Sequence, residues 1–324
     1  MQVSEPFVKK ITQSSFFSIG IKITVFIFSV GIILSILVDK VHLTQALIQA
    51  FLTQEGILVF VFMLFAMLLN VSVEAFKWKR LLASITTINF PTALMAVFSG
   101  ISAGLITPHG IGDYIGRVLF VDASKRLESI ASVLFSRIAQ LCITCFTGVI
   151  AIVYFYFIIQ VDMRLLFALA IAGITLLLVC LAWHYRAPLL DAMKRIPILK
   201  FIEKWFESLR NYSNQVFLET LYLSGLRYAI FLTQFVILLS FFHVDLPVEV
   251  LCVGAVFTFF VKSIIPTYLD LGVRELAAVF FFSNYHSADE NVLLASLSLW
   301  VFNLVIPAFI GLFCMFKIEY TKSN

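Results

Sequence analysis

Two interrupted hydrophobic stretches decide the fold of this chain. Residues 100–120 read GISAGLITPHGIGDYIGRVLF, and residues 259–282 read FFVKSIIPTYLDLGVRELAAVFFF. In each stretch an apolar segment meets a proline, Pro108 or Pro266, and an apolar segment returns only after glycine and charged residues. Proline lacks a backbone donor and disfavours helix at the residue before it. Each stretch therefore predicts two short helices joined by a bend.

The composition of the 324-residue chain is that of a membrane protein. Apolar residues make up 61% and charged residues only 13%, against about 25% charged in soluble domains. We predict an all-α polytopic membrane protein with about six full spans and interpret the first run as a retained span, not a signal peptide. The six apolar runs are residues 19–38, 57–73, 133–159, 165–183, 221–242 and 292–316.

The two interrupted stretches are too short for ordinary pairs of spans. They cover residues 91–120 and 249–283, whereas two crossings with a turn need about 40 residues. We therefore predict two re-entrant helical hairpins whose bent backbone is shielded by neighbouring helices. Two full crossings in each stretch preserve the same topology and remain the alternative.

Loop charges predict the orientation. With cytoplasmic termini, 15 of the 23 Lys and Arg residues fall inside, and only Lys40 and Arg164 fall outside, as the positive-inside rule requires. The two hairpins then enter from opposite sides, which predicts an inverted-topology repeat, residues 57–159 and 221–316. We expect one integral membrane domain, residues 19–318, in the cytoplasmic membrane, between a cytoplasmic N-terminus (1–18) and a cytoplasmic tail (319–324).

Residues 199–217 carry apolar side chains at helical spacing, with charged residues between them. This pattern predicts an amphipathic helix in the cytoplasmic interface. A packing linker between the two halves of the chain is the alternative.

Charged residues stand beside both helix breaks. Asp113 and Arg117 are four residues apart, which places them on one helix face, and Arg274 and Glu275 closely follow Gly272. Arginine and a half-helix N-terminus both suit a phosphate group. Two interpretations stay open: a site for an anionic lipid headgroup, or internal ion pairs that hold the hairpins in shape.

The predicted site follows from these breaks. Arg137 and Arg227 lie near the cytoplasmic ends of their runs, and we expect them to snorkel to the interface. Glu74 and Lys77 are expected to form an ion pair, and His109 to be a polar turn residue. The predicted substrate-binding residues are Pro108, Gly112, Asp113, Arg117, Pro266, Gly272, Arg274 and Glu275, and the secondary candidates are Glu74, Lys77, His109, Lys262 and Asp270.

Motifs of enzymes, metal sites and cofactor sites are lacking in the sequence. It has no Walker loop, HExxH or GxSxG, and the five cysteines lie in or beside apolar runs. The basic residues are explained by membrane orientation, so nucleic-acid binding is not predicted. We expect a non-enzymatic protein without metal or cofactor.

Three sequence blocks resemble the lysylphosphatidylglycerol synthetase transmembrane family, also called the flippase-like domain family. They are NVSVEAFKWKRLL at 70–82, GLITPHGIGDYIGR at 104–117 and LGVRELAAV at 271–279. The sequence departs from many relatives at Tyr268, Leu269 and Asp270, where they have a more glycine-rich turn. For the full-length relatives, the resemblance implies a membrane half that moves an aminoacylated phospholipid between leaflets and a cytosolic half that makes this lipid. The aminoacyl-transfer half is expected to be absent here.

Two functions of different classes remain. The first is a flippase that moves an anionic or modified phospholipid or a lipid-linked glycan, with Arg117 and Arg274 at the headgroup and one repeat rocking against the other. The second is a non-transporting partner that recruits or regulates a lipid-modifying enzyme or glycosyltransferase through residues 199–217. A membrane transferase has the least support. Membrane lipids are the expected partners, and the oligomeric state stays open.

Overall fold

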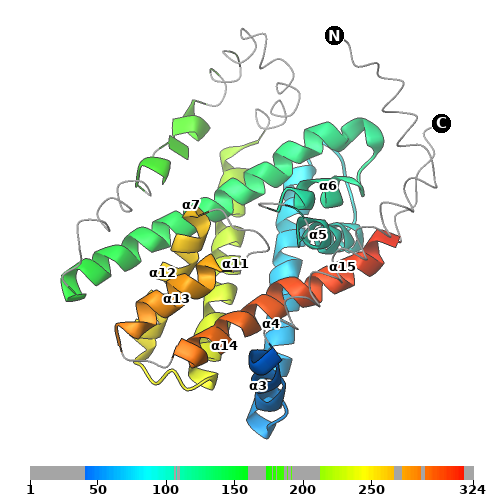
Figure 1. The fold of residues 1–324 in the computed structure, drawn as a ribbon. Helices are drawn as coiled ribbons and strands as arrows, with labels where there is room; N and C mark the ends of the chain where they lie inside the picture. The colour runs from blue at the N-terminus through cyan, green and yellow to red at the C-terminus, as the bar shows by residue number, and fades with distance from the viewer. Residues whose placement is uncertain are drawn as a thin grey trace, which may run out of the picture.

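The structure is a computed structural model in which every described element is helical (Figure 1). It describes residues 41–105, 107, 110–159, 173–176, 178–179, 181–185, 188, 191, 212–265, 272–285 and 289–316. In chain order the longer elements are α3 (Val41–Phe51), α4 (Gln54–Leu82), α5 (Phe90–Leu105), α6 (Gly112–Val118), α7 (Arg126–Ile159), α11 (Asn214–Phe241), α12 (Val248–Ile264), α13 (Val273–Ser283), α14 (Asp289–Trp300) and α15 (Ile306–Phe316).

Four stretches of helix are long and apolar enough to cross a membrane. They are Gln54–Leu82, Ala123–Ala151, Asn214–Phe241 and Asp289–Met315. They coincide with four of the six predicted spans. The other two, residues 19–38 and 165–183, lie wholly or largely outside the described residues, so the full set of six spans remains a prediction.

Both interrupted stretches form pairs of short helices packed against each other. The first hairpin is α5 with α6, of 16 and 7 residues, and the second hairpin is α12 with α13, of 17 and 11 residues. None of these helices reaches the roughly 20 residues that a span needs. The lengths favour re-entrant hairpins, while their depth in a bilayer stays a prediction.

Glycines allow the two helices of the first hairpin to approach closely. A Cβ atom on Gly112 would lie 2.0 Å from the carbonyl oxygen of Ala103, and one on Gly116 would lie 2.6 Å from that of Ser99. Because small residues let helix backbones touch, α6 lies directly on α5. This contact sets the height and direction of the charged side chains that α6 carries.

The order of long and short helices occurs twice. A long helix, two short helices and a second long helix appear as α4 to α7, and again as α11 to α15 with α14 and α15 as one kinked span. In Figure 1 the two hairpins lie on opposite sides of the neighbouring α4 and α11. The inversion of one repeat relative to the other, with respect to a membrane, stays a prediction.

Contacts between the repeats are reciprocal. The first short helix of each repeat packs on the last long helix of the other, α5 on α15 and α12 on α7. Both contacts use a glycine: a Cβ atom on Gly148 would meet the ring of Phe260, and one on Gly311 would meet the backbone of Phe98. Each hairpin is therefore held by the opposite repeat, which brings the two hairpins to one central region.

The last span contains a π-helical turn, Val301–Val305. The backbone N–H of Ile306 donates to the carbonyl of Val301, five residues back. Pro307 has no N–H to offer the carbonyl of Asn303, four residues before it. Such turns occur often at functional sites, and this one turns Asn303 toward the site described below.

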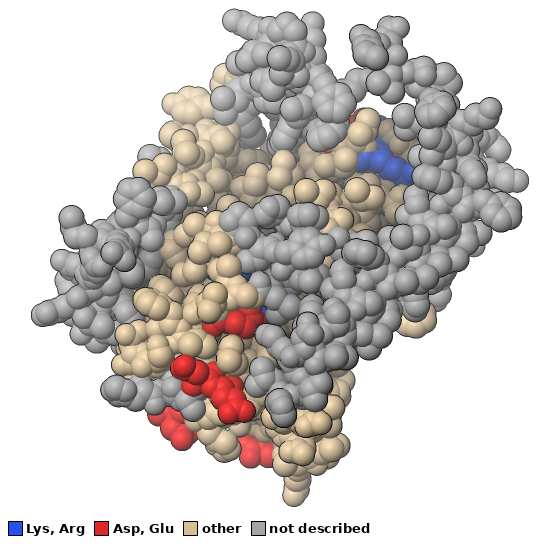
Figure 2. All heavy atoms as spheres, viewed as in Figure 1, with Lys and Arg blue, Asp and Glu red and all other residues tan. Residues whose placement is uncertain are grey.

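Charged residues divide between the two ends of the fold. Figure 2 shows a face of largely uncharged side chains with acidic side chains gathered at its lower end. The exposed acidic residues of the elements that meet there are Glu55, Asp245, Glu249, Asp289 and Glu290. Lys79, Arg80, Lys125 and Arg126 lie at the opposite end, around the end of α4 and the start of α7. The distribution agrees with the predicted orientation, which stays a prediction.

Only residues 212–217 of the predicted interfacial helix are described. There the buried hydroxyl of Tyr212 donates to the carbonyl of Leu81 at 2.9 Å, and its ring packs on Phe135. Residues 214–217 are the first turn of α11. This part of the segment packs against α4 and α7, as the linker alternative expects, and the rest lies outside the described residues.

Candidate functional site

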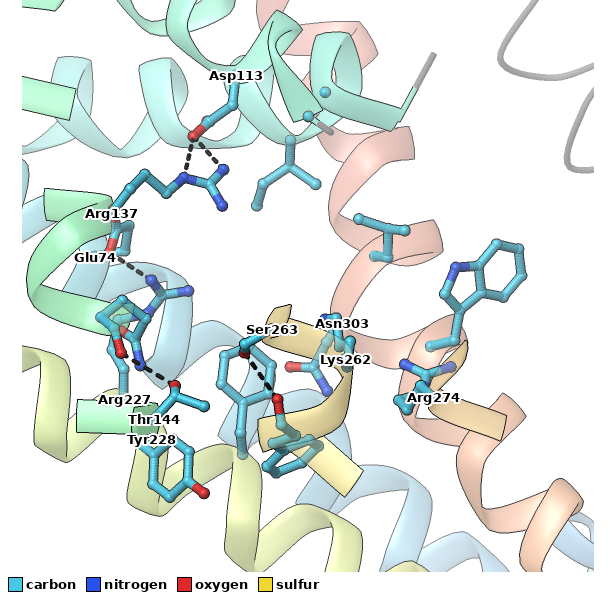
Figure 3. A pocket seen from close by; sticks show the side chains of 18 of the residues that line it. Glu74, Asp113, Arg137, Thr144, Arg227, Tyr228, Lys262, Ser263, Arg274 and Asn303 are labelled. Atoms are coloured by element: carbon cyan, nitrogen blue, oxygen red, sulfur yellow. Dashed lines mark hydrogen bonds and ion pairs between the residues drawn. The ribbon is translucent and has the colours of Figure 1, made fainter. Parts of the chain in front are cut away.

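A cavity of about 550 Å³ lies between the two hairpins (Figure 3). Its wall includes both ends of the bend in the first hairpin, the C-terminal end of α12, the first turn of α13, and the π-helical turn of the last span. Figure 3 shows Asp113, Arg137 and Arg227 on one side of the cavity and Lys262, Arg274 and Asn303 on the other. The charged side chains that line it are Glu74, Asp113, Arg117, Arg137, Arg227, Lys262 and Arg274.

Glu74 of α4 is the centre of a buried group of cations. Its Oε1 accepts from Arg117 at 2.6 Å and from the hydroxyl of Ser136 at 3.0 Å. Its Oε2 accepts from Lys77 at 2.9 Å and from Arg227 at 2.5 Å. The Glu74 side chain is only 2% exposed. One carboxylate thus joins cations from three helices, α4, α6 and α11.

Asp113 of α6 is the centre of a second group of cations, formed by two arginines. Arg117, one turn further on the same helix, grips it through two parallel hydrogen bonds of 2.7 and 2.9 Å. Arg137 of α7 reaches the same carboxylate through its Nε and Nη2 atoms, the former at 3.1 Å. A Cβ atom on Gly100 of α5 would lie 2.2 Å from Asp113 Oδ1. Only glycine at that position leaves room for this carboxylate.

We call the linked residues of the first repeat and α11 the charge cluster; its members are Glu74, Lys77, Asp113, Arg117, Arg137 and Arg227. The cluster holds four cations and two carboxylates. The described residues of the cluster therefore carry two more positive than negative formal charges. A buried excess of positive charge is costly unless an anion or water compensates it.

Exposure separates the cations of the cluster into two kinds. Lys77 and Arg117 are 1% and 3% exposed, and their hydrogen bonds go to groups inside the protein. Arg227 is 17% exposed and Arg137 is 50% exposed, and both border the cavity. Figure 3 shows Arg137 and Arg227 on the same wall. These two arginines are the most exposed cations of the cluster.

The second hairpin carries a more local arrangement. Arg274 donates to Ser296 Oγ at 2.9 Å and to Oε1 of its neighbour Glu275. Glu275 Oε2 in turn accepts the backbone N–H of Gly272 at 2.7 Å and so caps the start of α13. Gly272 has φ of +93°, a conformation that glycine adopts readily. Arg274 borders the cavity, and its charge is balanced by the adjacent carboxylate.

The structure brings five of the thirteen predicted site residues to one cavity. Asp113, Arg117, Arg274 and the secondary candidates Glu74 and Lys262 all border the cavity. The predicted ion pair between Glu74 and Lys77 is confirmed. Gly112 and Gly272 lie at the starts of α6 and α13, beside the cavity-lining residues. Four predicted residues lie outside the described residues: Pro108, His109, Pro266 and Asp270.

Arg137 and Arg227, which we expected to snorkel to the interface, are members of the charge cluster, and their depth in a membrane stays a prediction. Both are hydrogen-bonded to carboxylates of the charge cluster, because α7 and α11 pack beside α4. A signal for this was present in the sequence. Polar residues recur along one face of α7 at spacings of three or four, namely Ser129, Ser132, Ser136, Gln140 and Thr144. A polar stripe on an apolar span indicates a protein-facing or wet surface, not a lipid-facing one.

Neither a curated protein nor a solved structure gives a significant match to the chain. A family model does match, over residues 19–311, and its description is the lysylphosphatidylglycerol synthase TM region. The match covers both hairpins, three of the four long helices, most of the fourth and every member of the charge cluster. That family is a membrane domain associated with lipid handling. The chain belongs to the lysylphosphatidylglycerol synthase TM region family.

Proposed function

We propose that this protein translocates a lipid headgroup across the cytoplasmic membrane through the cavity between its two hairpins. One observation carries the proposal: a single cavity touches both hairpins, and five cationic side chains but only two carboxylates line it among the described residues. Membrane lipids are then its partners, and transport needs no covalent chemistry by the protein.

The size of the cavity suits a headgroup. A volume of about 550 Å³ falls within the range of sites for small molecules, about 300–1,000 Å³. A whole phospholipid with two acyl chains would not fit. In our proposal the headgroup enters the cavity while its acyl chains stay in the surrounding lipid.

The charged side chains of the cavity can replace the interactions with water that a headgroup loses when it enters the membrane. A charged group at the bilayer centre costs several kcal/mol or more unless a partner or water compensates it. Arginine is well suited to a phosphate because its planar fork makes two parallel hydrogen bonds. Arg137 and Arg227 border the cavity from adjacent helices, so one phosphate group between them would be held from two directions.

The packing of the two repeats suggests how access alternates. Each hairpin rests on the last long helix of the other repeat through a glycine contact. Rocking of one repeat against the other would open the cavity to one side and close it to the other. The glycine contacts are the surfaces at which we propose the sliding takes place.

Reconstitution tests the proposal directly. Purified protein is placed in phosphatidylcholine vesicles that contain fluorescent phosphatidylglycerol, and transfer between leaflets is followed by chemical quenching of the outer label. We expect transfer well above that of protein-free vesicles. Replacing the two more exposed arginines of the charge cluster, Arg137→Gln with Arg227→Gln, should lower the rate at least tenfold, because the phosphate loses these partners.

A matched control removes a cation outside the cavity. Lys125→Gln breaks an exposed ion pair with Glu128 and should leave the rate unchanged. Equal rates for the wild-type and double-variant proteins, both folded by thermal unfolding, would contradict the assignment of the cavity. Absence of transfer by the wild-type protein under every lipid composition would contradict the proposed function itself.

A further inference from the structure

The charges and hydrogen bonds of the charge cluster favour some headgroups over others. We propose that the cavity selects a headgroup of net negative charge that also carries hydroxyl groups, and that it rejects a cationic aminoacyl headgroup. This inference rests on the proposed function and deepens it. It is not what the family description suggests, since a lysyl ester adds ammonium groups to the lipid.

The carboxylates of the site are already occupied. Each oxygen of Glu74 and of Asp113 accepts at least one hydrogen bond from a cationic side chain. Both oxygens of Glu275 are engaged as well: Oε1 accepts from Arg274, and Oε2 accepts from the backbone N–H of Gly272. An ammonium group is a donor only and seeks acceptors, best of all a carboxylate. Among the described residues around the cavity it would find no carboxylate that is not already engaged.

The remaining field is positive. Arg137 is half exposed, although Asp113 holds its Nε and Nη2 atoms. Arg227 and Lys262 also line the cavity, and Arg274 lines it while paired with Glu275. In a site screened from water, like charges repel strongly and opposite charges attract strongly. An ammonium group on the headgroup would sit among arginines, whereas a phosphate would complete their hydrogen bonds.

Gln140 points to a second feature of the ligand. It borders the cavity one turn after Arg137, and its Nε2 donates to the carbonyl of Ser224 at 3.3 Å. Its Oε1 atom is buried and has no hydrogen-bond partner in the described part of the chain. A buried acceptor left without a donor costs about 1–3 kcal/mol in general. A ligand hydroxyl beside the phosphate would supply that donor without adding positive charge.

The test compares lipids on the wild-type protein, so it depends on no variant that could fail to fold. Vesicles contain one fluorescent probe lipid each: phosphatidylglycerol, which is anionic and bears hydroxyls; lysylphosphatidylglycerol, which is cationic; or phosphatidylethanolamine, which is zwitterionic. We expect phosphatidylglycerol to transfer at least tenfold faster than lysylphosphatidylglycerol, with phosphatidylethanolamine in between.

A charge variant of the same shape checks the cause. Gln140→Glu adds a carboxylate to the cavity wall and should reduce the preference for phosphatidylglycerol over lysylphosphatidylglycerol severalfold. Gln140→Leu removes the acceptor without adding charge. It should slow phosphatidylglycerol transfer by about tenfold or less and leave the order of the three lipids unchanged.

The outcomes separate the two proposals. Transfer of lysylphosphatidylglycerol as fast as phosphatidylglycerol, or faster, would overturn this inference while the proposed function stands. An unchanged preference in Gln140→Glu, with the protein folded, would overturn the electrostatic cause. Transfer of none of the three lipids would overturn the proposed function, and the inference with it.

Discussion

The two hairpins share their chemistry and differ in how widely their charges are connected. Each places an arginine and a carboxylate beside a helix break. In the first hairpin, Asp113 and Arg117 are linked to residues of α4, α7 and, through Glu74, α11. In the second, Arg274 and Glu275 contact each other and Ser296 of α14. The first hairpin is part of a network of four helices, and the second holds a local pair.

The same arginine–carboxylate motif has different consequences in its two surroundings. A local pair of opposite charges is neutral. Its carboxylate, Glu275, also caps the N-terminus of α13 by accepting the Gly272 N–H. A network with more cations than carboxylates leaves positive charge facing a cavity. Hence we assign ligand contact mainly to the side of the first hairpin and a shaping role to the pair in the second.

The largest expected difference concerns stability. Glu74→Gln removes the carboxylate that Lys77, Arg117 and Arg227 share, and breaking a buried ion pair costs about 3–5 kcal/mol. Glu275→Gln should cost less, about 1–3 kcal/mol, because Arg274 keeps its bond to Ser296. Thermal unfolding in detergent checks the order.

Glu219→Gln is the control for both, since it breaks an exposed ion pair with Arg80. It should leave the unfolding temperature unchanged. An equal loss for Glu74→Gln and Glu275→Gln would remove the distinction between network and local pair.

Glycine substitutions probe the packing of the two hairpins. Gly100→Ala puts a methyl group 2.2 Å from Asp113 Oδ1, and Gly254→Ala puts one 2.4 Å from the end of the Phe282 ring. Overpacking typically costs about 1–3 kcal/mol in either place. Only Gly100→Ala should also slow lipid transfer, because it displaces a carboxylate of the charge cluster.

Gly225→Ala serves as the matched control, because the nearest atom to its new methyl would be 3.9 Å away. In a helix interior this change should be neutral or stabilising by up to about 1 kcal/mol. If Gly254→Ala slowed transfer as much as Gly100→Ala, packing rather than charge would explain both effects.

The smallest expected effects come from two buried serines. Ser136 donates to Glu74 at 3.0 Å, and Ser296 donates to Glu275 at 3.2 Å. Ser136→Ala and Ser296→Ala should each cost about 1 kcal/mol in the free energy of unfolding. We expect slower lipid transfer only for Ser136→Ala, and equal transfer by the two variants would argue against the asymmetry.

Much of the fold could be predicted from local patterns. Apolar runs located the four long helices, because length and hydrophobicity are properties of a short segment. The positions of prolines and glycines predicted both hairpins, because proline restricts the backbone and glycine frees it at the residue itself. The π-helical turn was not predicted, although Pro307 supplies its physical cause.

The site was predicted only in part. Asp113 with Arg117 and Glu74 with Lys77 follow from helical spacing, because residues three or four apart share a helix face. Hydropathy could not show whether Arg137 and Arg227 face lipid, headgroups or a cavity. That depends on which helices become neighbours, and nothing in one segment encodes it.

Local sequence patterns predict where the helices break and which charges stand beside each break, because both follow from backbone chemistry and helical spacing. Helix packing is what joins the charges of the first hairpin to those of α4, α7 and α11. The contacts that make this network connect residues 24, 43 and 153 positions apart. They exist because glycine contacts hold each hairpin on the opposite repeat, which gathers distant cations around one cavity.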